Sequence, residues 1–232
     1  MENKVLNYAI VLASGTGSRY GSELPKQFSK IAEKTILENT LDVFENNDNI
    51  DKIILVITPN YLGFVQNILV QGGYKKVDKI IEGGELRKDS SYNGVFAIDD
   101  EDANVLIHDC ARPFVTDRII NDCILALNNY KAVNVAIPAV DTVIEVENNF
   151  IKSTPNRSSL MQVQTPQCFK LSLIKKAHEL AKNDTNFTDD CGLITKHNLA
   201  DVYVVQGDIE NFKITYPKDF YLAEKILLER KK

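Results

Sequence analysis

The residues of this chain that are best suited to chemistry lie in one stretch, positions 12–28. Closely spaced glycines share it with two cationic side chains, Arg19 and Lys26. Glycine has no Cβ, so it lets the backbone turn tightly and approach a ligand closely. A glycine-rich loop that follows a strand and carries cations is typical of phosphate-binding sites. The spacing therefore predicts a cradle for phosphate groups, built from Gly15, Gly17 and Gly21.

This glycine loop differs from the two best-known nucleotide motifs. A Walker-type loop needs Gly-Lys-Ser/Thr after four further residues, and neither Gly15 nor Gly17 has that continuation. A dinucleotide fingerprint would need glycine where Tyr20 stands. Pro25 disfavours a helix directly after the glycines, so the loop is long enough to wrap a triphosphate. The alternative is an ordinary glycine-rich turn that binds nothing.

The elements that must position this loop alternate along the first half of the chain. Short runs rich in β-branched residues predict strands, and stretches with helical spacing lie between them. Such alternation is typical of an α/β fold with a mostly parallel sheet and helices on both faces. Ligands of such sheets bind outside the carboxyl ends of the strands, so we expect Ala13, Gly83-Gly84, Asp109 and Pro138 to converge. The expected strands are 8–13, 53–58, 78–82, 104–108 and 132–137, and the expected helices are 35–46, 61–71, 88–98 and 117–129.

The alternation ends after residue 138, where two short apolar runs predict a hairpin. The runs 142–146 and 150–151 flank the segment 147–149, and no helix follows that could cover them. A two-stranded hairpin alone is marginally stable in water, so we expect it to pack on the domain or to reach a second subunit. Beyond it, the sequence predicts a helix at 171–182, a strand at 201–205 and a C-terminal helix from 217.

Composition limits the class of protein. The chain has 232 residues, 44% of them hydrophobic, which is enough to bury one core, so we expect a single domain over 1–232. A net charge of -5 disfavours a general nucleic-acid binder. The four cysteines show no Cys-x-x-Cys spacing and no paired histidines, so we expect buried thiols and no zinc site. Without an apolar export segment or a run of about 18 apolar residues, a cytoplasmic protein without membrane contact is expected.

A series of short motifs runs in order from the glycine loop almost to the end of the chain. Each motif alone is weakly specific, and the ordered set is strong. They are Gly15-Thr16-Gly17-Ser18-Arg19, Pro25-Lys26-Gln27-Phe28, Gly83-Gly84 with Arg87 and Asp89-Ser90, His108-Asp109 with Ala111-Arg112-Pro113, Asp141-Thr142, Arg157, Gln164-Thr165-Pro166-Gln167, Thr188-Asp189-Asp190, and Lys213-Ile214-Thr215 before Pro217. This set resembles the cytidylyltransferases that act on sugar-alcohol phosphates, a family that includes enzymes for 2-C-methyl-D-erythritol 4-phosphate and for ribitol 5-phosphate.

The resemblance implies a Rossmann-like nucleotidyltransferase fold and a reaction that uses CTP. In the family, a phosphate oxygen of the acceptor attacks the α-phosphorus of CTP in line, and pyrophosphate leaves. Negative charge spreads over the equatorial oxygens, so catalysis is mainly positioning and charge stabilisation. The matching cations here are Arg19, Lys26 and Lys213, which become the expected catalytic residues. The expected nucleotide-binding residues are Ala13, Ser14, Gly15, Gly17, Gly83, Gly84 and Ser90.

The acceptor side of the site is implied by the same resemblance. The family uses the position of Asp109 near the acceptor hydroxyls and near a metal, expected here as Mg²⁺ or another divalent cation that bridges the CTP phosphates. It uses the positions of Thr142 and Arg157 to hold the acceptor phosphate. In the family, the hairpin is an arm, 139–160 here, that crosses to the neighbouring subunit. We therefore expect a homodimer with shared active sites.

Several of these residues also have plain structural interpretations from the residues alone. The alternative for Asp109 is to cap a helix or to form a buried ion pair with Arg112, but its position at the end of a strand favours a role in the site. Gly83-Gly84 fits an ordinary turn between a strand and a helix. Arg87 lies at a helix start, where arginine usually covers the surface with its stem. We expect His108 to be a packing residue, since the expected reaction needs no proton shuttle.

The identity of the acceptor stays open between two alditol phosphates. Ile144 stands where the methylerythritol enzymes usually have a basic residue, and Met161 where they usually have Trp and ribitol enzymes often have Tyr. The runs 25–31 and 137–142 favour ribitol 5-phosphate, whereas the motifs at 111–113 and 188–190 favour methylerythritol 4-phosphate. On balance, ribitol 5-phosphate is slightly favoured. The alternative functions are a nucleotidyltransferase with another nucleotide or acceptor, and a non-catalytic nucleotide-binding module.

Overall fold

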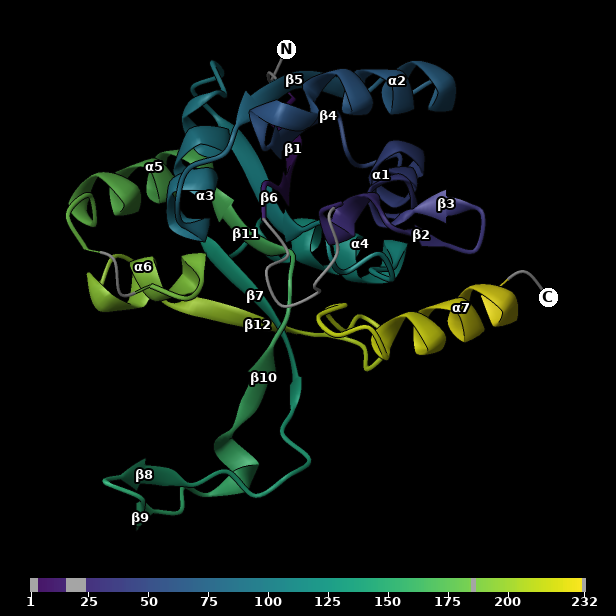
Figure 1. Ribbon diagram of the computed structural model, residues 1–232. Coiled ribbons are helices and arrows are strands. Elements are labelled where there is room, and N and C mark those ends of the chain that lie inside the picture. The colour runs from purple at the N-terminus through teal and green to yellow at the C-terminus, as the bar shows by residue number, and fades with distance from the viewer. Residues whose placement is uncertain (1–3, 16–23, 185–186, 231–232) are drawn as a thin grey trace.

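One large mixed sheet runs through the centre of the chain (Figure 1). The computed structural model describes residues 4–15, 24–184 and 187–230, and within them the sheet has the order β10-β7-β11-β6-β1-β4-β5, with β12 beside β7. The neighbours β6-β1-β4-β5 are parallel, as are β7 and β12, whereas β10 and β11 run antiparallel to their partners. The strands are β1 (Leu6–Ala13), β4 (Lys52–Ile57), β5 (Val77–Glu82), β6 (Ala103–Asp109), β7 (Ala132–Pro138), β10 (Met161–Val163), β11 (Gln167–Lys170) and β12 (Val202–Gln206).

Helices cover both faces of this sheet, because alternate residues of its central strands point to opposite sides. On β1, Ala9 and Val11 belong to one buried cluster, and Tyr8 and Ile10 belong to the other. The first cluster is closed by α1 (Ile36–Asn46), α2 (Leu62–Gly72), α4 (Asp117–Ala126) and α7 (Asp219–Arg230). The second is closed by α3 (Arg87–Phe96), α5 (Leu171–Leu180) and α6 (Asp190–Lys196). The expected α/β architecture is confirmed.

Several short elements escape the sequence-based expectation, and β11 and α6 are the two that matter most for the sheet and the site. β11 is inserted antiparallel between β6 and β7, in a sheet expected to be mostly parallel. With four residues directly after Pro166, it is too short to show a period, and its pairing depends on distant strands. The helix α6 spans seven residues and is likewise too short for a helical pattern. The other expected strands and helices are present, with small shifts at their ends.

The short elements after the glycine loop hold Lys26 in place. A 3-10 turn, η1 (Lys26–Phe28), leads into the small sheet of β2 (Lys30–Ile31) and β3 (Lys34–Thr35). Phe28 is buried and packs its ring 5.0 Å from that of Tyr61 in the 3-10 turn η2 (Pro59–Tyr61) and 5.1 Å from that of Phe64. Phe28 thus anchors this turn against the α2 side of the sheet. Because Lys26 belongs to the same turn, its backbone is held in place as well.

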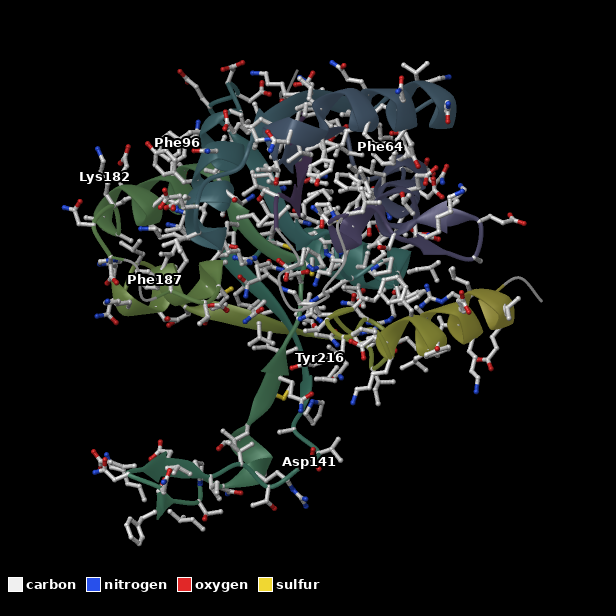
Figure 2. The ribbon with its side chains drawn as sticks, in the orientation of Figure 1. Phe64, Phe96, Asp141, Lys182, Phe187 and Tyr216 are labelled. Carbon is white, nitrogen blue, oxygen red and sulfur yellow. The ribbon has the colours of Figure 1, made fainter. Side chains whose placement is uncertain are left out.

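The region after β7 stands apart from the sheet. β8 (Glu145–Glu147) and β9 (Phe150–Ser153) pair antiparallel in a separate two-stranded sheet, and the chain returns through η3 (Arg157–Ser159) to β10. Figure 1 shows this hairpin well away from the helices, and Figure 2 shows its side chains, near Asp141, without a covering layer. Phe150 is 77% exposed and Ile151 is 66% exposed.

Two expectations from composition can be compared with the described residues. All four cysteines are free and buried, as expected. None of the helices in the described ranges combines the length and the apolar character that crossing a membrane would require.

Candidate active site

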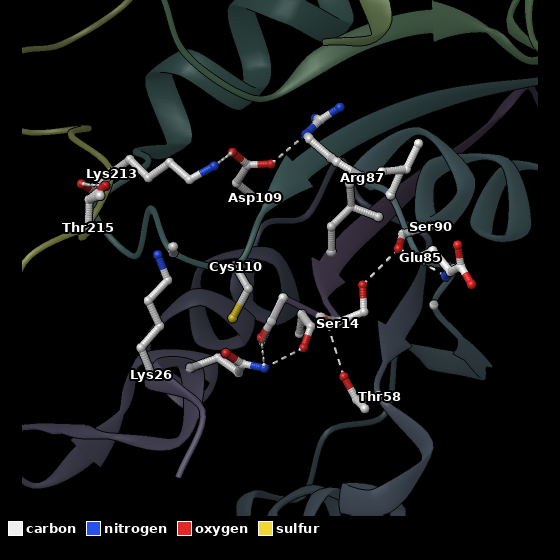
Figure 3. A pocket seen from close by; sticks show the side chains of 18 of the residues that line it. Ser14, Lys26, Thr58, Glu85, Arg87, Ser90, Asp109, Cys110, Lys213 and Thr215 are labelled. Atoms are coloured by element: carbon white, nitrogen blue, oxygen red, sulfur yellow. Dashed lines mark hydrogen bonds and ion pairs between the residues drawn. The ribbon is translucent and has the colours of Figure 1, made fainter. Parts of the chain in front are cut away.

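A cavity of about 440 Å³ opens at the carboxyl ends of β1, β4, β5 and β6 (Figure 3). Ala13 ends β1, and Asp109 ends β6. Gly83 and Gly84 follow β5, and Lys26 and Lys213 enter from two distant parts of the chain. The cavity therefore lies where a parallel sheet binds its ligands.

The backbone that follows β1 is fixed by two side chains from neighbouring segments. The Gln27 side-chain amide donates to the carbonyl oxygens of Ala13, at 2.7 Å, and of Gly15, at 3.0 Å. The Thr58 hydroxyl donates to the Ser14 carbonyl at 2.9 Å. These bonds hold the start of the glycine loop against η1 and the end of β4, so the wall of the cavity is set before any ligand arrives.

The turn after β5 is packed so closely that it requires glycine. A Cβ on Gly83 would lie 2.2 Å from the Cβ of Ser14, and one on Gly84 would lie 2.3 Å from the Cβ of Asp89. The Ser90 hydroxyl is 2.8 Å from that of Ser14 and accepts a hydrogen bond from the Gly84 N–H at 3.1 Å. Glycine is therefore needed here for contacts within the protein, a reason that sequence reasoning did not give.

We expect the Gly83→Ala substitution to disturb the cavity more than it unfolds the chain. Relieving the overlap moves Ser14, and overpacking of this kind costs about 1–3 kcal/mol of unfolding free energy. Affinity for CTP, the expected ligand, should fall by more than the stability alone explains, as measured by titration calorimetry and denaturant unfolding. Gly63→Ala is the control, because a Cβ there meets nothing within 4 Å. A Gly83→Ala protein with unchanged CTP affinity would contradict this role.

Two of the three expected catalytic cations share the cavity. The Lys26 ammonium donates to the Ile214 carbonyl at 2.7 Å, next to Lys213 in the chain. The Lys213 ammonium lies 2.7 Å from Asp109 Oδ2. Figure 3 shows both lysines reaching into the same space. The third cation, Arg19, lies outside the described residues.

The carboxylate of Asp109 is held between two cations. Arg87 Nε lies 3.0 Å from its Oδ1, opposite Lys213 on Oδ2. Burial alone would raise the pKa of this carboxyl, but Arg87 and Lys213 hold the pKa well below its usual range. Asp109 is therefore ionised at neutral pH. The ion pair considered with Arg112 is wrong, because the Arg112 guanidinium instead donates to the carbonyls of Asn211 and Val163.

His108 is linked to the backbone of Asp109 through the Thr165 hydroxyl. It is fully buried, edge-on to the Phe44 ring, and burial lowers its pKa to about 4, so the ring is neutral. Its Nε2 lies 3.0 Å from the Arg112 carbonyl, which fixes the proton on Nε2, and its Nδ1 then accepts from the Thr165 hydroxyl at 3.0 Å. The Thr165 oxygen in turn accepts the Asp109 N–H at 3.1 Å. His108 is a packing residue, as expected, and this chain of bonds fixes the end of β6.

A second cavity of about 260 Å³ adjoins the first. Three residues, Arg87, Asp109 and Lys213, line both. Its remaining lining residues are Arg112, Val163, Gln164, Thr165, Gln167, Thr188 and Asp189. Apart from Val163, these carry polar or charged side chains. The paired cavities are therefore suited to a polyanion and a hydroxyl-rich molecule side by side.

The expected site residues divide into three groups. Lys26, Lys213 and Asp109 line the first cavity, together with Ala13, Ser14, Gly15, Gly83, Gly84 and Ser90. Arg19 and Gly17 lie outside the described residues. Thr142 and Arg157 are exposed on either side of the hairpin and line neither cavity of the described chain.

The expected convergence at Pro138 is wrong. Pro138 ends β7 but lines neither cavity. The inserted strand β11 separates β7 from β6, so the carboxyl end of β7 is carried away from those of β6 and β1 and leads into the hairpin.

Among the lining or supporting residues that were not predicted, three are instructive: Thr58, Gln27 and Arg87. Thr58 follows β4, so the strand-end rule that found Ala13 would also have found it. Gln27 belongs to the motif Pro25-Lys26-Gln27-Phe28, but no sequence pattern indicates that its side-chain amide is buried and bonded to the backbone. The role of Arg87 depends on contacts with Asp109 and Asp190, which are 22 and 103 positions away in the chain.

Comparisons with known proteins give a consistent result. Residues 7–229 match the family model for 2-C-methyl-D-erythritol 4-phosphate cytidylyltransferase (IspD). The enzyme of that name from Clostridium botulinum strain 657 is 41% identical over 95% of this chain and 97% of its own length. The solved structure of 4-diphosphocytidyl-2C-methyl-D-erythritol synthase from Anaerococcus prevotii superposes with a TM-score of 0.85 and 30% identity, covering 97% of this chain and 96% of that one.

A further relative has a second activity in its name. The bifunctional ribulose 5-phosphate reductase/CDP-ribitol pyrophosphorylase Bcs1 of Haemophilus influenzae is 42% identical over 98% of this chain. That match covers 49% of the relative, so the chain spans about half of its length.

Proposed function

Because the chain belongs to the family of 2-C-methyl-D-erythritol 4-phosphate cytidylyltransferases, we propose that it transfers the cytidylyl group of CTP to an alditol phosphate. As a member of this family, the protein is a CTP-dependent nucleotidyltransferase. Its acceptor and the roles of its site residues are what we propose. The observation that carries the proposal is the meeting of Lys26, Lys213 and Asp109 at one cavity with the tight Gly83-Gly84 turn.

In the proposed reaction, CTP lies in the larger cavity and the alditol phosphate in the smaller. A phosphate oxygen of the acceptor forms a bond to the α-phosphorus while the bond to the β-phosphate oxygen breaks, and pyrophosphate leaves with that electron pair. No general base is needed, since a phosphate dianion is already nucleophilic at neutral pH. Lys26 and Lys213 stabilise the negative charge that builds on the α-phosphate oxygens. Arg19 is proposed as the third cation.

A divalent cation, Mg²⁺ by preference, is part of this proposal. No cluster of three potential ligand side chains occurs within the described ranges, and Mg²⁺ in nucleotide sites needs only one or two carboxylates because phosphates and waters supply the rest. Asp109 fits this limited role, since each of its oxygens keeps a lone pair beyond its ion pair. When bound, the ion would neutralise charge on the triphosphate.

For the acceptor, we propose ribitol 5-phosphate first. The smaller cavity has Val163 as its one hydrocarbon side chain among the described lining residues, which suits a chain that has a hydroxyl on each carbon except the phosphorylated one. The Haemophilus influenzae relative is named for CDP-ribitol. The second candidate is 2-C-methyl-D-erythritol 4-phosphate, which the family model and the Clostridium botulinum relative name.

We also propose that the arm, residues 139–160, crosses to a second copy of the chain in a homodimer. The supporting observation is a row of exposed apolar side chains on a hairpin that could not be stable alone. These are Val140, Val143, Ile144, Val146, Phe150 and Ile151. In such a dimer, Thr142 and Arg157 would complete the acceptor cavity of the partner.

Pyrophosphate release is the measurement that tests the function. Each of the four nucleoside triphosphates is supplied with Mg²⁺ and with either ribitol 5-phosphate or methylerythritol 4-phosphate. We expect release with CTP, and faster release with ribitol 5-phosphate. Faster release with methylerythritol 4-phosphate reverses the choice of acceptor. Binding of CTP without release for any polyol phosphate supports a non-catalytic module instead.

A further inference from the structure

Both cavities are lined by the Arg87 guanidinium, which bridges two carboxylates. Arg87 begins α3. Its Nε lies 3.0 Å from Asp109 Oδ1, and its Nη1 lies 2.7 Å from Asp190 Oδ2. One side chain thus joins the end of β6 to the start of α6, across 81 positions of sequence between the two carboxylates. Figure 3 shows the Asp109 end of this bridge.

The Asp190 side chain is buried outside both cavities. It is 1% exposed. Its Oδ1 accepts a hydrogen bond from the Ser91 hydroxyl at 2.6 Å. An ionised carboxylate this deeply buried requires a cation, and Arg87 supplies it. The Asp190 side chain therefore contacts Arg87 and Ser91 and opens into neither cavity.

The backbone of Asp190 is hydrogen-bonded to a residue that lines the smaller cavity. Its N–H donates to the Gln167 side-chain carbonyl at 2.7 Å, and the Gln167 amide donates to Asp189 Oδ2 at 2.7 Å. Gln167 and Asp189 both line that cavity. The residue that orients Arg87 is thus fixed to the acceptor side, while Arg87 itself follows the Gly83-Gly84 turn on the nucleotide side.

We propose that Asp190 is a positioning residue that, through Arg87, holds the Asp109 carboxylate in place between the nucleotide and the acceptor. This inference rests on the proposed function for the meaning of the two cavities. The guanidinium is planar and rigid, so fixing Nη1 against Asp190 also fixes the direction of Nε toward Asp109. Lys213 holds the other carboxylate oxygen but, as a point charge on a flexible stem, does not set an orientation.

The test uses Asp190→Asn, which keeps the shape of the side chain and removes its charge. One carboxylate oxygen becomes an amide nitrogen, and the ion pair with Arg87 is lost. We expect kcat to fall about 10- to 100-fold, because small misplacement of a reacting group has effects of that size. The CTP dissociation constant, measured without acceptor, should change by less than about threefold, because Asp190 does not line the nucleotide cavity.

A matched control separates positioning from general loosening of α3. Lys88, next to Arg87, is 8% exposed and donates to the carbonyls of Ala181 and Asp184 after α5. Lys88→Met removes those bonds without touching Arg87, so it should lower the melting temperature and keep kcat within about threefold of wild type. A Lys88→Met protein with the same loss of kcat as Asp190→Asn would overturn the proposal.

A double variant tests whether Asp190 acts through Arg87. If it does, Arg87→Gln combined with Asp190→Asn should lose no more activity than the worse single variant, since the two residues form one unit. Losses that multiply in the double variant would mean that the two side chains act independently, and the proposal would be wrong.

A readout independent of turnover distinguishes this inference from the proposed function. In the wild type, the Arg87 Nε–H should give a side-chain ¹⁵N NMR signal that exchanges slowly with water, and Asp190→Asn should make that exchange fast. Wild-type protein that transfers no cytidylyl group refutes the proposed function while this signal still reports the placement of Arg87. An unchanged Arg87 signal in Asp190→Asn refutes the positioning role even if the enzyme is active.

Discussion

Lys26→Ala is expected to lower kcat for cytidylyl transfer by about 10²- to 10³-fold, the usual effect of removing one group that stabilises transition-state charge. The Lys26 ammonium lies at the larger cavity, bonded to the Ile214 carbonyl beside Lys213. The charge on the α-phosphate is greatest during transfer, so kcat should fall more than CTP affinity. Single-turnover rates and CTP binding, measured on the same protein, separate the two effects.

The control for Lys26 is Lys30→Ala. Lys30 is exposed on the nearby strand β2 and lines neither cavity of the described chain. Its removal changes the net charge equally and should leave turnover near the wild-type value. If the Lys26→Ala protein remains folded by circular dichroism and turns over at a near-normal rate, this lysine has no part in the mechanism.

Arg157→Ala is expected to raise KM for the alditol phosphate about 10- to 100-fold, the range for loss of a charged hydrogen bond. KM for CTP should change little. Within one chain, Arg157 lies on η3, bonds to the Val140 carbonyl at 3.1 Å and lines neither cavity. Lys152→Ala is the matched control, since Lys152 is an exposed arm cation whose ammonium lies 3.7 Å from a Glu147 carboxylate oxygen. Equal losses for both substrates would count against the acceptor assignment.

Mixing the Lys26→Ala and Arg157→Ala proteins, at an acceptor concentration where each alone has little activity, tests whether Arg157 acts in the partner. A subunit with Lys26→Ala, refolded together with one carrying Arg157→Ala, would form a heterodimer in which one site has both wild-type residues. With random pairing, activity should return to about a quarter of the wild-type value. If each arm instead served its own subunit, no site in the mixture would be complete and activity would stay at the level of the single variants.

The α/β sheet could be predicted because its strands are short β-branched runs separated by helical patterns. The same logic found the cavity, since Ala13, Gly83 and Asp109 each follow a strand that ends at the same edge. The order of the strands in the sheet could not be predicted to the same extent. β11 gives only four residues of pattern, and its place between β6 and β7 depends on pairing with strands more than 30 positions away.

The pairing of side chains within the site could not be predicted from the sequence either. The notion that Asp109 pairs with Arg112 follows from their closeness in the chain, but the guanidinium that reaches it belongs to Arg87. The burial of Asp190 and the hydrogen bonds from Gln27 to the Ala13 and Gly15 carbonyls depend on how distant segments pack. The residue types alone do not predict such packing. The roles of Thr142 and Arg157 depend on a second subunit and stay predictions.

The insertion of β11 has a consequence for synthesis on the ribosome. β6 and β7 emerge first and are joined through α4, yet the strand that pairs with both comes only at residues 167–170. Until then, both carry open edges that can recruit another nascent chain. Fragments that stop before residue 167 should therefore aggregate, whereas those that extend past residue 170 have the piece that fills the gap.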